Sequence, residues 1–328
     1  MQATMAATAL TMTAAGAWLW AQEAPVPVFK AKVDLVVVSF TVTDSKGKYV
    51  NGLKPSDFKI SEDGIVQKLS TFAEGDRPAM EVGEGGVLKP MVPSTAAALA
   101  TAQPTETMAG TSVFVLFDTS NFMYRGFVYA EDAIADFVRG LDKADSVAVY
   151  TFSRNLSRAS DLSGDRSNAI GGLRKAVAGD DTALYNGLLL TLRDAAKVPG
   201  RKVVIVFSNG PDNASMVAPD DVRAVAEDEG IPIYVISTND VNKDPISSSV
   251  FRRITGSTGG KAYWAKTWQK QVEAFDAIRE DIGNSYAVTY YPAPNPNEGF
   301  RKINIEIVSD TAKKYRVRAR PGYRPRSY

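Results

Sequence analysis

Residues 112–121 read SVFVLFDTSN, and residues 202–212 read KVVIVFSNGPD. Each stretch begins with an uninterrupted apolar run about as long as a strand, and a strand that is apolar at every position is typically buried on both faces. Each run then stops at a cluster of short polar residues. Two such strands with helical segments between them predict a mostly parallel sheet covered by helices on both sides.

The segments around these two strands alternate between helix and strand patterns. Apolar residues recur at helical spacing in residues 126–141, 183–197 and 268–282, and a fourth helix is bounded by Pro219 and Gly230. Further strands are expected at residues 145–152, 231–237 and 261–265. Residues 111–283 are therefore predicted to form a doubly wound α/β domain.

The flanks of this domain have β patterns. Residues 33–75 hold a β-branched run broken by turn signals, and residues 284–323 hold alternating apolar residues such as Ile303, Ile305 and Ile307. Each piece is too small to cover both faces of a sheet. We expect the flanks to pair into one small all-β sandwich into which the α/β domain is inserted; the alternative is two separate β flanks.

Two further segments lie outside these units. Residues 76–110, with EVGEGG and an Ala/Thr-rich tract, have the composition of a flexible linker. Residues 1–22 are uncharged and mostly small or apolar, which is typical of a secretory signal peptide. The alternatives are a disordered leader or an uncleaved anchor. We expect export, to the periplasm, the cell surface or the medium, with no transmembrane span in the mature chain.

The composition excludes several kinds of chemistry. The chain has no Cys and no His, so it lacks disulfides, Cys-ligated metals, Cys nucleophiles and Ser-His-Asp triads. Lys and Arg number 38 against 37 Asp and Glu, which argues against a basic surface for nucleic acid. The basic residues near the C-terminus, including Arg316, Arg318 and Arg320, alternate with apolar ones and predict the solvated face of a strand.

Polar clusters follow or precede three elements of the predicted α/β domain. They are Asp118–Asn121, Asp180–Thr182 and Ser208–Asp212. Ligands bind at the carboxyl ends of strands in open parallel sheets. Carboxylate and hydroxyl oxygens gathered there would suit a hard cation such as Mg²⁺, whereas the alternative is that these residues only cap the following helices.

The same clusters carry a family resemblance. The pattern FDTS at 117–120, DDTALYNGL at 180–188 and VIVFSNGPD at 204–212 resembles a von Willebrand factor type A (VWA) domain. The flanks TVTDSKGKYVNGLKPSDFKISEDG at 41–64 and YRVRARPGY at 315–323 are similar to those of the VWA-related proteins described in Acidobacteria.

This resemblance implies a metal-ion-dependent adhesion site, in which a divalent cation, usually Mg²⁺, is completed by an acidic residue of the partner. The positions that match are Asp118, Ser120 and Thr182, and the candidate ligands also include Asn209, with Asp181 and Asp212 as possible additions. Two of the five family positions depart from the pattern, because Phe122 stands in place of the second Ser and Asn209 in place of the third-loop Asp. The loss of one oxygen ligand and one negative charge predicts a degenerate site with weak or lost metal binding.

The predicted function is an exported, non-enzymatic protein-interaction or adhesion module that binds another protein on the top face of the α/β domain. Asn121, Phe122, Tyr124 and Arg125 are the candidate contact residues, since exposed aromatics and Arg are enriched at interface hot spots. The same segment could instead be the buried start of a helix. The alternative function is a haloacid-dehalogenase-like phosphohydrolase with Asp118 as nucleophile, but Ser120 stands where its general acid belongs.

Overall fold

The computed structural model describes residues 35–91, 110–142, 145–308 and 314–325. The predicted signal peptide and residues 92–109 of the predicted linker lie outside these ranges. Among the helices in the described ranges, none combines the length and the apolar character that crossing a bilayer would require.

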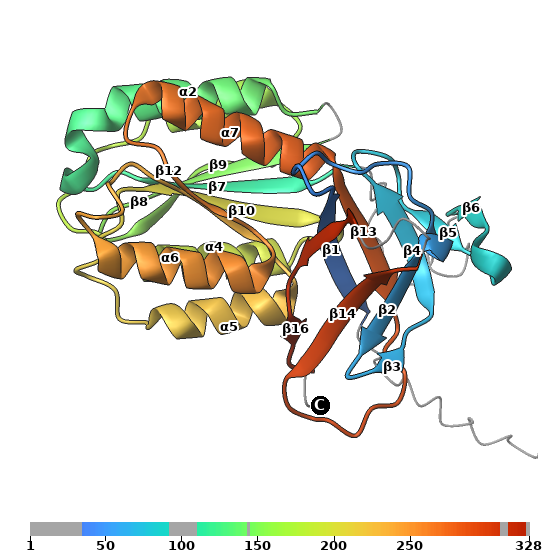
Figure 1. Ribbon diagram of the computed structural model, residues 1–328. Coiled ribbons are helices and arrows are strands. Elements are labelled where there is room, and N and C mark those ends of the chain that lie inside the picture. Colours follow the sequence, from blue (N-terminus) through green and yellow to red (C-terminus); the bar gives the residue numbers. More distant parts are fainter. Residues whose placement is uncertain (1–34, 92–109, 143–144, 309–313, 326–328) are drawn as a thin grey trace, which may run out of the picture. The chain divides into compact units, whose positions relative to one another are not determined.

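The α/β sheet has the strand order β12-β11-β10-β7-β8-β9 (Figure 1). Its strands are β7 (Ser112–Asp118), β8 (Ser146–Phe152), β9 (Leu156–Ser163), β10 (Lys202–Ser208), β11 (Ile233–Ser237) and β12 (Ala262–Trp264). All neighbours are parallel except β8 and β9, which are antiparallel. The prediction of a mostly parallel sheet is confirmed, and the antiparallel edge strand β9 was not predicted.

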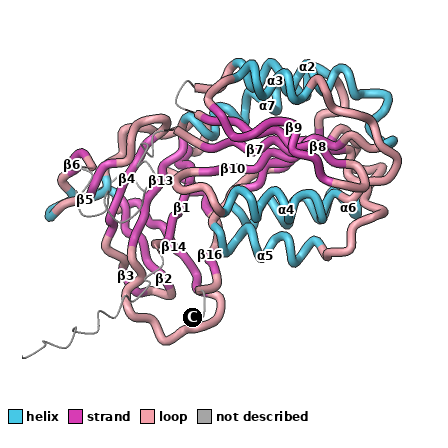
Figure 2. Tube along the Cα trace, turned by 180° about the vertical axis from the view of Figure 1, so that it is seen from behind, coloured by secondary structure: helices cyan, strands magenta, loops and turns pink. Residues whose placement is uncertain are grey.

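Helices cover both faces of this sheet (Figures 1 and 2). They are α2 (Phe127–Arg139), α3 (Arg166–Leu173), α4 (Leu184–Ala196), α5 (Pro219–Glu229), α6 (Pro245–Thr258) and α7 (Trp268–Gly283). Alternate residues of β7 point to opposite sides. Val113, Val115 and Phe117 pack with α2, α3 and α7, whereas Phe114 and Leu116 pack with α4, α5 and α6.

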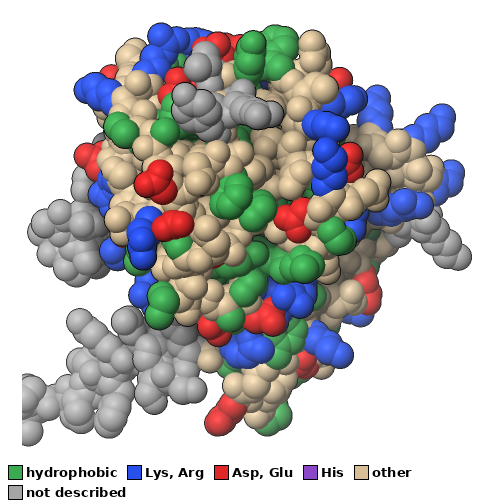
Figure 3. All heavy atoms as spheres, turned by 90° about the vertical axis from the view of Figure 1, so that its left-hand side faces the viewer, with side chains coloured by type: hydrophobic (Ala, Val, Ile, Leu, Met, Phe, Trp, Pro, Cys, Tyr) green, Lys and Arg blue, Asp and Glu red, His purple; other side chains and the backbone are tan. Residues whose placement is uncertain are grey.

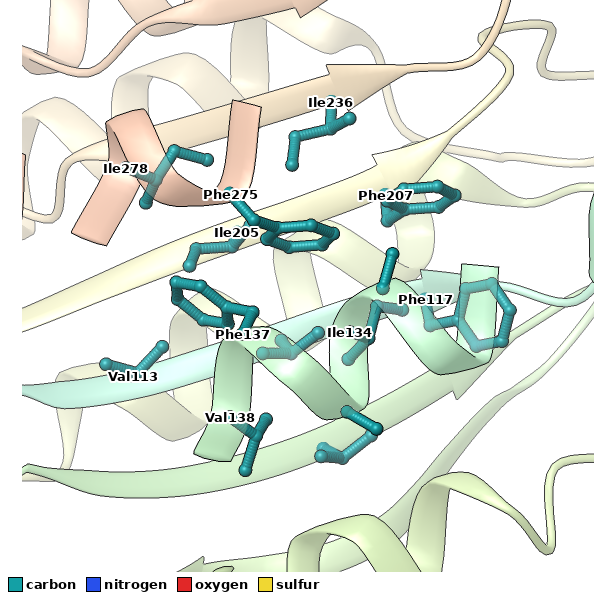
Figure 4. Close-up of a cluster of buried hydrophobic side chains, with 14 of the residues drawn as sticks. Val113, Phe117, Ile134, Phe137, Val138, Ile205, Phe207, Ile236, Phe275 and Ile278 are labelled. Carbon is teal, nitrogen blue, oxygen red and sulfur yellow. The ribbon is translucent and has the colours of Figure 1, made fainter. Parts of the chain in front are cut away.

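Aromatic side chains fill the first of these two layers. Figure 4 shows Phe137 of α2, Phe275 of α7 and Phe207 of β10 next to one another. The ring centroids of Phe207 and Phe275 are 5.8 Å apart, and those of Phe137 and Phe275 are 5.0 Å apart. Such pairs add about 0.5–1.5 kcal/mol beyond the burial of their area, so this layer fixes the sheet on which the loops of the candidate site are mounted.

The flanks form two antiparallel sheets that face each other, with strand orders β15-β1-β13-β4-β5-β6 and β16-β14-β2-β3. The strands before the α/β domain are β1 (Val36–Thr43), β2 (Phe58–Glu62), β3 (Ile65–Val66), β4 (Leu69–Glu74), β5 (Met80–Val82) and β6 (Leu88–Pro90). Those after it are β13 (Ser285–Tyr290), β14 (Arg301–Ile307), β15 (Arg316–Ala319) and β16 (Gly322–Tyr323). Short 3₁₀ turns, η1 (Pro55–Asp57) and η2 (Glu84–Gly86), join some of them.

Strands from the two flanks pair with one another in both sheets. β1 lies between β15 and β13, with Val38 opposite Val288, and β14 pairs with β2, with Ile305 opposite Ile60. One flank alone would leave unpaired strand edges and half of a core. The predicted insertion of an α/β domain into a sandwich built from both flanks is confirmed.

Two expectations from the sequence are corrected in this sandwich. Met80–Val82 and Leu88–Pro90, predicted as linker, are strands, because Val82 and Leu88 pack on the sandwich core around a turn in which Gly85 has φ 70°. The basic C-terminal stretch is only partly a solvated face, because Arg316 and Arg324 are exposed and two other arginines are not. Arg320 is buried and Arg318 is half-buried, since both donate to groups of neighbouring elements.

Glu62 is the central polar residue of the sandwich. Its carboxylate is fully buried and accepts hydrogen bonds from the hydroxyls of Tyr290 (3.1 Å) and Tyr323 (2.9 Å). It also accepts from Arg301 Nη1 at 3.0 Å. Three strands that follow the α/β domain are thus tied to one residue that precedes it.

Candidate functional site

The three polar clusters meet at the carboxyl edge of the α/β sheet, where β7 and β10 lie side by side. This is the point at which the strand order changes direction, and open α/β sheets bind ligands there. The backbone N–H of Asn121 donates to Asp180 O at 3.4 Å, and Asn209 Nδ2 donates to Phe122 O at 3.0 Å. These bonds join the loop after β7 to the other two loops.

Asp118 ends β7 at the centre of this arrangement. Its Oδ2 accepts from Ser208 Oγ at 2.6 Å, and its Oδ1 accepts from the backbone N–H of Ser120 at 2.9 Å. Burial raises the pKa of the Asp118 carboxyl, while the Ser208 hydrogen bond acts in the opposite direction. The sequence placed Ser208 in a polar cluster but did not identify it as a site residue; its position at the end of the strand beside β7 was the available signal.

Three predicted ligands present oxygens that are buried and have no hydrogen-bond partner among the described residues. They are Ser120 Oγ, Thr182 Oγ1 and Asn209 Oδ1. The Ser120 hydroxyl nevertheless lies near enough to the Asp118 carboxylate to lower the pKa of that group. A buried polar atom without a partner costs about 1–3 kcal/mol, so such atoms are rare and need a reason. Three of them lie in loops that are joined around one buried carboxylate.

Helix capping does not account for these hydroxyls. Ser120 occupies the N-cap position of the 3₁₀ helix η3 (Asn121–Gly126), yet its side chain makes no capping hydrogen bond. Thr182 lies one residue before Ala183, which is the N-cap of α4, and its hydroxyl has no partner either. The geometry therefore does not support the alternative that these side chains serve only as helix caps.

The donor set fits a hard divalent cation. One carboxylate from Asp118 and three neutral oxygens from Ser120, Thr182 and Asn209 are the kind of ligand that Mg²⁺ prefers. In the described part of the chain, no group of three or more acidic side chains is placed to hold a metal ion. A cation at this position would therefore depend on few negative charges.

The two acidic residues considered as further ligands have other partners. Asp181 pairs with Arg154 at 3.2 Å on the surface. The carboxylate of Asp212 accepts from the backbone N–H of Tyr185 at 3.0 Å and from Ser215 Oγ at 2.6 Å. Asp212 therefore holds the loop after β10 against the start of α4, and its charge raises the pKa of Asp118 only as a secondary cause after burial.

The predicted partner-contact residues lie in η3. Asn121 is exposed, and Phe122, where the second Ser of the family pattern belongs, has 47% of its surface exposed. The side chains of Tyr124 and Arg125 lie outside the described part of the structure. The next residue after Phe122, Met123, is buried under the loop, where Thr238 Oγ1 lies 3.5 Å from its sulfur.

Exposed hydrophobic side chains surround the candidate site on the edge of the domain that faces left in Figure 1. They come from η3, the α3–α4 loop, the β10–α5 loop and the first turns of α6 and α7, and they are Phe122, Val177, Met216, Ile246 and Trp268. We call this surface the rim face. Figure 3 views it directly and shows hydrophobic side chains over its middle with charged ones around them.

The geometry gives no support to Asp118 as a nucleophile. The side chain is 0% exposed, and both carboxylate oxygens already accept hydrogen bonds. A nucleophile must approach a phosphorus atom with a free oxygen, and a general acid must stand within hydrogen-bond reach of the leaving group. The residue two positions further on, Ser120, has a hydroxyl that cannot act as that acid.

Comparisons with known proteins agree with this arrangement. Residues 113–211 match the family model of the von Willebrand factor type A domain. A curated dihydroorotate dehydrogenase (quinone) from Rhizobium leguminosarum bv. trifolii is 29% identical over 155 residues, which are 47% of this chain and 39% of that protein. The chain thus spans about two fifths of the length of this relative.

Among solved structures, a von Willebrand factor type A protein from Catenulispora acidiphila is 11% identical, with a TM-score of 0.45, covering 88% of this chain and 73% of that one. The vWF domain of the type V pili tip protein Mfa5 from Porphyromonas gingivalis is 12% identical, with a TM-score of 0.45, covering 53% of this chain and 95% of that one. The matched residues 113–211 run from β7 through β10 and include Asp118, Ser120, Thr182 and Asn209. The resemblance to the von Willebrand factor type A domain is thus confirmed over residues 113–211, the part of the α/β domain that the family model matches.

Proposed function

We propose that the chain is an exported, non-enzymatic adhesion module that binds a partner protein on the rim face. The observation that supports this most strongly is the combination of three unpartnered buried oxygens around Asp118 with the exposed hydrophobic side chains of the rim face. Apolar side chains exposed together on a folded domain are typical of protein contact sites.

A divalent cation at Asp118 would contribute to this contact without dominating it. Asp118, Ser120, Thr182 and Asn209 would hold the ion, and the ion would offer a positive charge to an acidic group of the partner. Asn209 supplies no charge and Phe122 supplies no oxygen, so affinity for the cation falls with the missing ligands. The exposed Phe122 ring instead adds apolar area at the position where a ligand is lost.

The test is capture of the partner by the immobilised mature chain from the envelope fraction of the cells that produce it, followed by titration of the identified partner. We expect Met216→Ser and Ile246→Ser to weaken binding about tenfold or more, since each removes an exposed apolar contact of the rim face. EDTA should weaken the binding of the partner without abolishing it.

Leu190→Ser is the matched control, because Leu190 is an exposed apolar residue on the outer side of α4, away from the rim face. It should bind the partner as the wild type does. Equal affinities for all three variants would contradict the proposed docking surface. Export is tested separately, by the mass of the N-terminal peptide of the protein recovered outside the cytoplasm.

A further inference from the structure

A cavity lies at the end of the α/β sheet opposite the rim face, where β1, the end of α5 and β16 meet. In Figures 1 and 2, β16 lies beside the end of α5. The cavity has a volume of about 360 Å³ and is lined by residues of both the α/β domain and the sandwich. Small-molecule sites in proteins have volumes from about 300 Å³ upward.

Four cationic and two acidic side chains border this cavity. They are Lys202, Arg301, Arg320 and Arg324 on one hand, and Asp228 and Glu229 on the other. Arg301 is already paired with the buried carboxylate of Glu62 at 3.0 Å. Asp228 Oδ1 accepts the backbone N–H of Arg324 at 2.9 Å. The side chains of Arg320 and Arg324 also border the cavity, and neither forms an ion pair with a carboxylate of the described residues.

Arg320 is buried, with 4% of its surface exposed, and forms no ion pair with a described carboxylate. Its Nη1 donates to Glu227 O and its Nη2 donates to Val37 O at 2.9 Å, while its Nε has no partner. A guanidinium carries five N–H donors, and a buried charge without a counter-ion is costly. Burial accordingly lowers the pKa of Arg320.

Arg201 shows what a buried arginine with a purely structural role looks like in the same chain. It is also buried, and it donates to the carbonyls of Gly75 and Ile282 and to the hydroxyl of Ser285. Both of its terminal nitrogens have partners, and the cavity beside it measures only about 20 Å³. Arg320 differs in both respects, because it has an unused donor and borders a much larger space.

Arg324 adds a second guanidinium to the same cavity. It is exposed and lies over the ring of Phe300, with its Cζ atom 5.5 Å from the ring centroid, and it has no ion pair within the described residues. Stacking on an aromatic ring holds a guanidinium in place while its N–H groups stay available. Two guanidiniums on one cavity match the oxygens of a carboxylate or phosphate.

We propose that this cavity binds a small oxyanion, a carboxylate or a phosphate, between Arg320 and Arg324. The anion would give Arg320 a directly bonded counter-ion, since the carboxylates of Asp228 and Glu62 act on Arg320 without forming an ion pair with it. It would also bridge the α/β domain and the sandwich, since Arg320 contacts α5 and β1 at once. The site is independent of the rim face and of the function proposed for it.

The experiment measures thermal unfolding and calorimetric binding of the full chain in phosphate and in malonate, with sodium chloride at matched ionic strength as the reference. We expect a saturable rise in the unfolding midpoint with at least one of the two oxyanions, because a ligand that binds only the folded state stabilises it. The two arms distinguish a phosphate site from a carboxylate site.

Arg324→Gln should bind the effective oxyanion about tenfold or more weakly, since it removes a charged hydrogen-bond donor. Arg316→Gln removes the same charge from the exposed Arg316 on β15 and should bind as the wild type does. Arg320→Lys keeps the positive charge but removes the planar guanidinium with its several N–H donors. This variant should therefore also bind the oxyanion more weakly. The proposal is overturned if no oxyanion gives a saturable shift beyond chloride, or if Arg324→Gln and the wild type bind equally.

Discussion

Asp118 in the α/β domain and Glu62 in the sandwich are both carboxylates with 0% of their surface exposed. Glu62 is surrounded by donors that all point to it, from Tyr290, Tyr323 and Arg301. Asp118 also accepts two hydrogen bonds, yet the oxygens of Ser120 and Thr182 in the adjoining loops have no partner.

We interpret this difference as that between a structural polar group and one that we propose to be prepared for binding. A buried network in which every member is satisfied holds elements in one arrangement. A buried group whose neighbours are unsatisfied lowers stability until a ligand arrives, and such strain is found at functional sites. The following experiments test this comparison.

The largest effect is expected from Glu62→Ala. The substitution leaves the guanidinium of Arg301 and the hydroxyls of Tyr290 and Tyr323 without their acceptor, so the free energy of unfolding should fall by about 3–5 kcal/mol. Urea denaturation measures this change. Glu306→Ala, which removes a surface pair with Lys59 on the adjacent strand, is the control and should cost less than about 1 kcal/mol. A loss for Glu62→Ala as small as that of the control would refute the structural role.

Magnesium should stabilise the wild type and not Asp118→Asn. With free Mg²⁺ at ten times its dissociation constant, the free energy of unfolding should rise by about 1.4 kcal/mol, and EDTA should reverse the rise. The measurement is thermal unfolding across a Mg²⁺ titration up to millimolar concentrations. A wild-type protein that does not respond to Mg²⁺ or Mn²⁺ would show that the oxygens around Asp118 hold no cation.

Phe122→Ser should strengthen Mg²⁺ binding at the same site, because it introduces the hydroxyl that the family pattern has at this position. We expect Mg²⁺ affinity to rise by up to about tenfold, because each further oxygen ligand replaces a water in the coordination shell. Isothermal titration with Mg²⁺ measures the change. Phe122→Ala removes the ring without adding an oxygen, so an equal gain in that variant would mean that the ring, and not the missing ligand, limits affinity.

The smallest effect is expected from Asp181→Asn. Asp181 pairs with Arg154 on the surface, so its loss should change stability by less than about 1 kcal/mol and leave Mg²⁺ affinity unchanged. The same titration applies. Weakened Mg²⁺ binding would place Asp181 among the ligands and correct our account of the site.

The sequence predicted those parts of the fold whose signals are local. The helices α2, α4, α5 and α7 follow from apolar spacing and from end signals such as Pro219 and Gly230. The helix α6 was missed although Asp244 caps it, Pro245 starts it and Gly259 ends it, because its apolar stripe is short. The edge strand β9 was missed because its exposed residues, such as Arg158 and Asp161, break the apolar pattern.

The candidate site was partly predictable for the same reason. Asp118 and Thr182 lie in short polar clusters next to strongly patterned elements, so their meeting at one edge could be inferred from the parallel sheet alone. The state of their oxygens could not be inferred. Whether Ser120 caps η3 or stands without a partner depends on the loop geometry, and the sequence does not specify that geometry.

The sequence by itself determined the parallel sheet, its helical layers and the position of the polar loops, because apolar periodicity acts over one element and its neighbours in the chain. Only the tertiary structure decided which distant groups meet. It joined strands more than 200 residues apart around Glu62, buried the basic Arg320 against α5 and β1, and left Ser120, Thr182 and Asn209 unpartnered. Partners at such separations are set by how whole layers pack, and no local pattern specifies them.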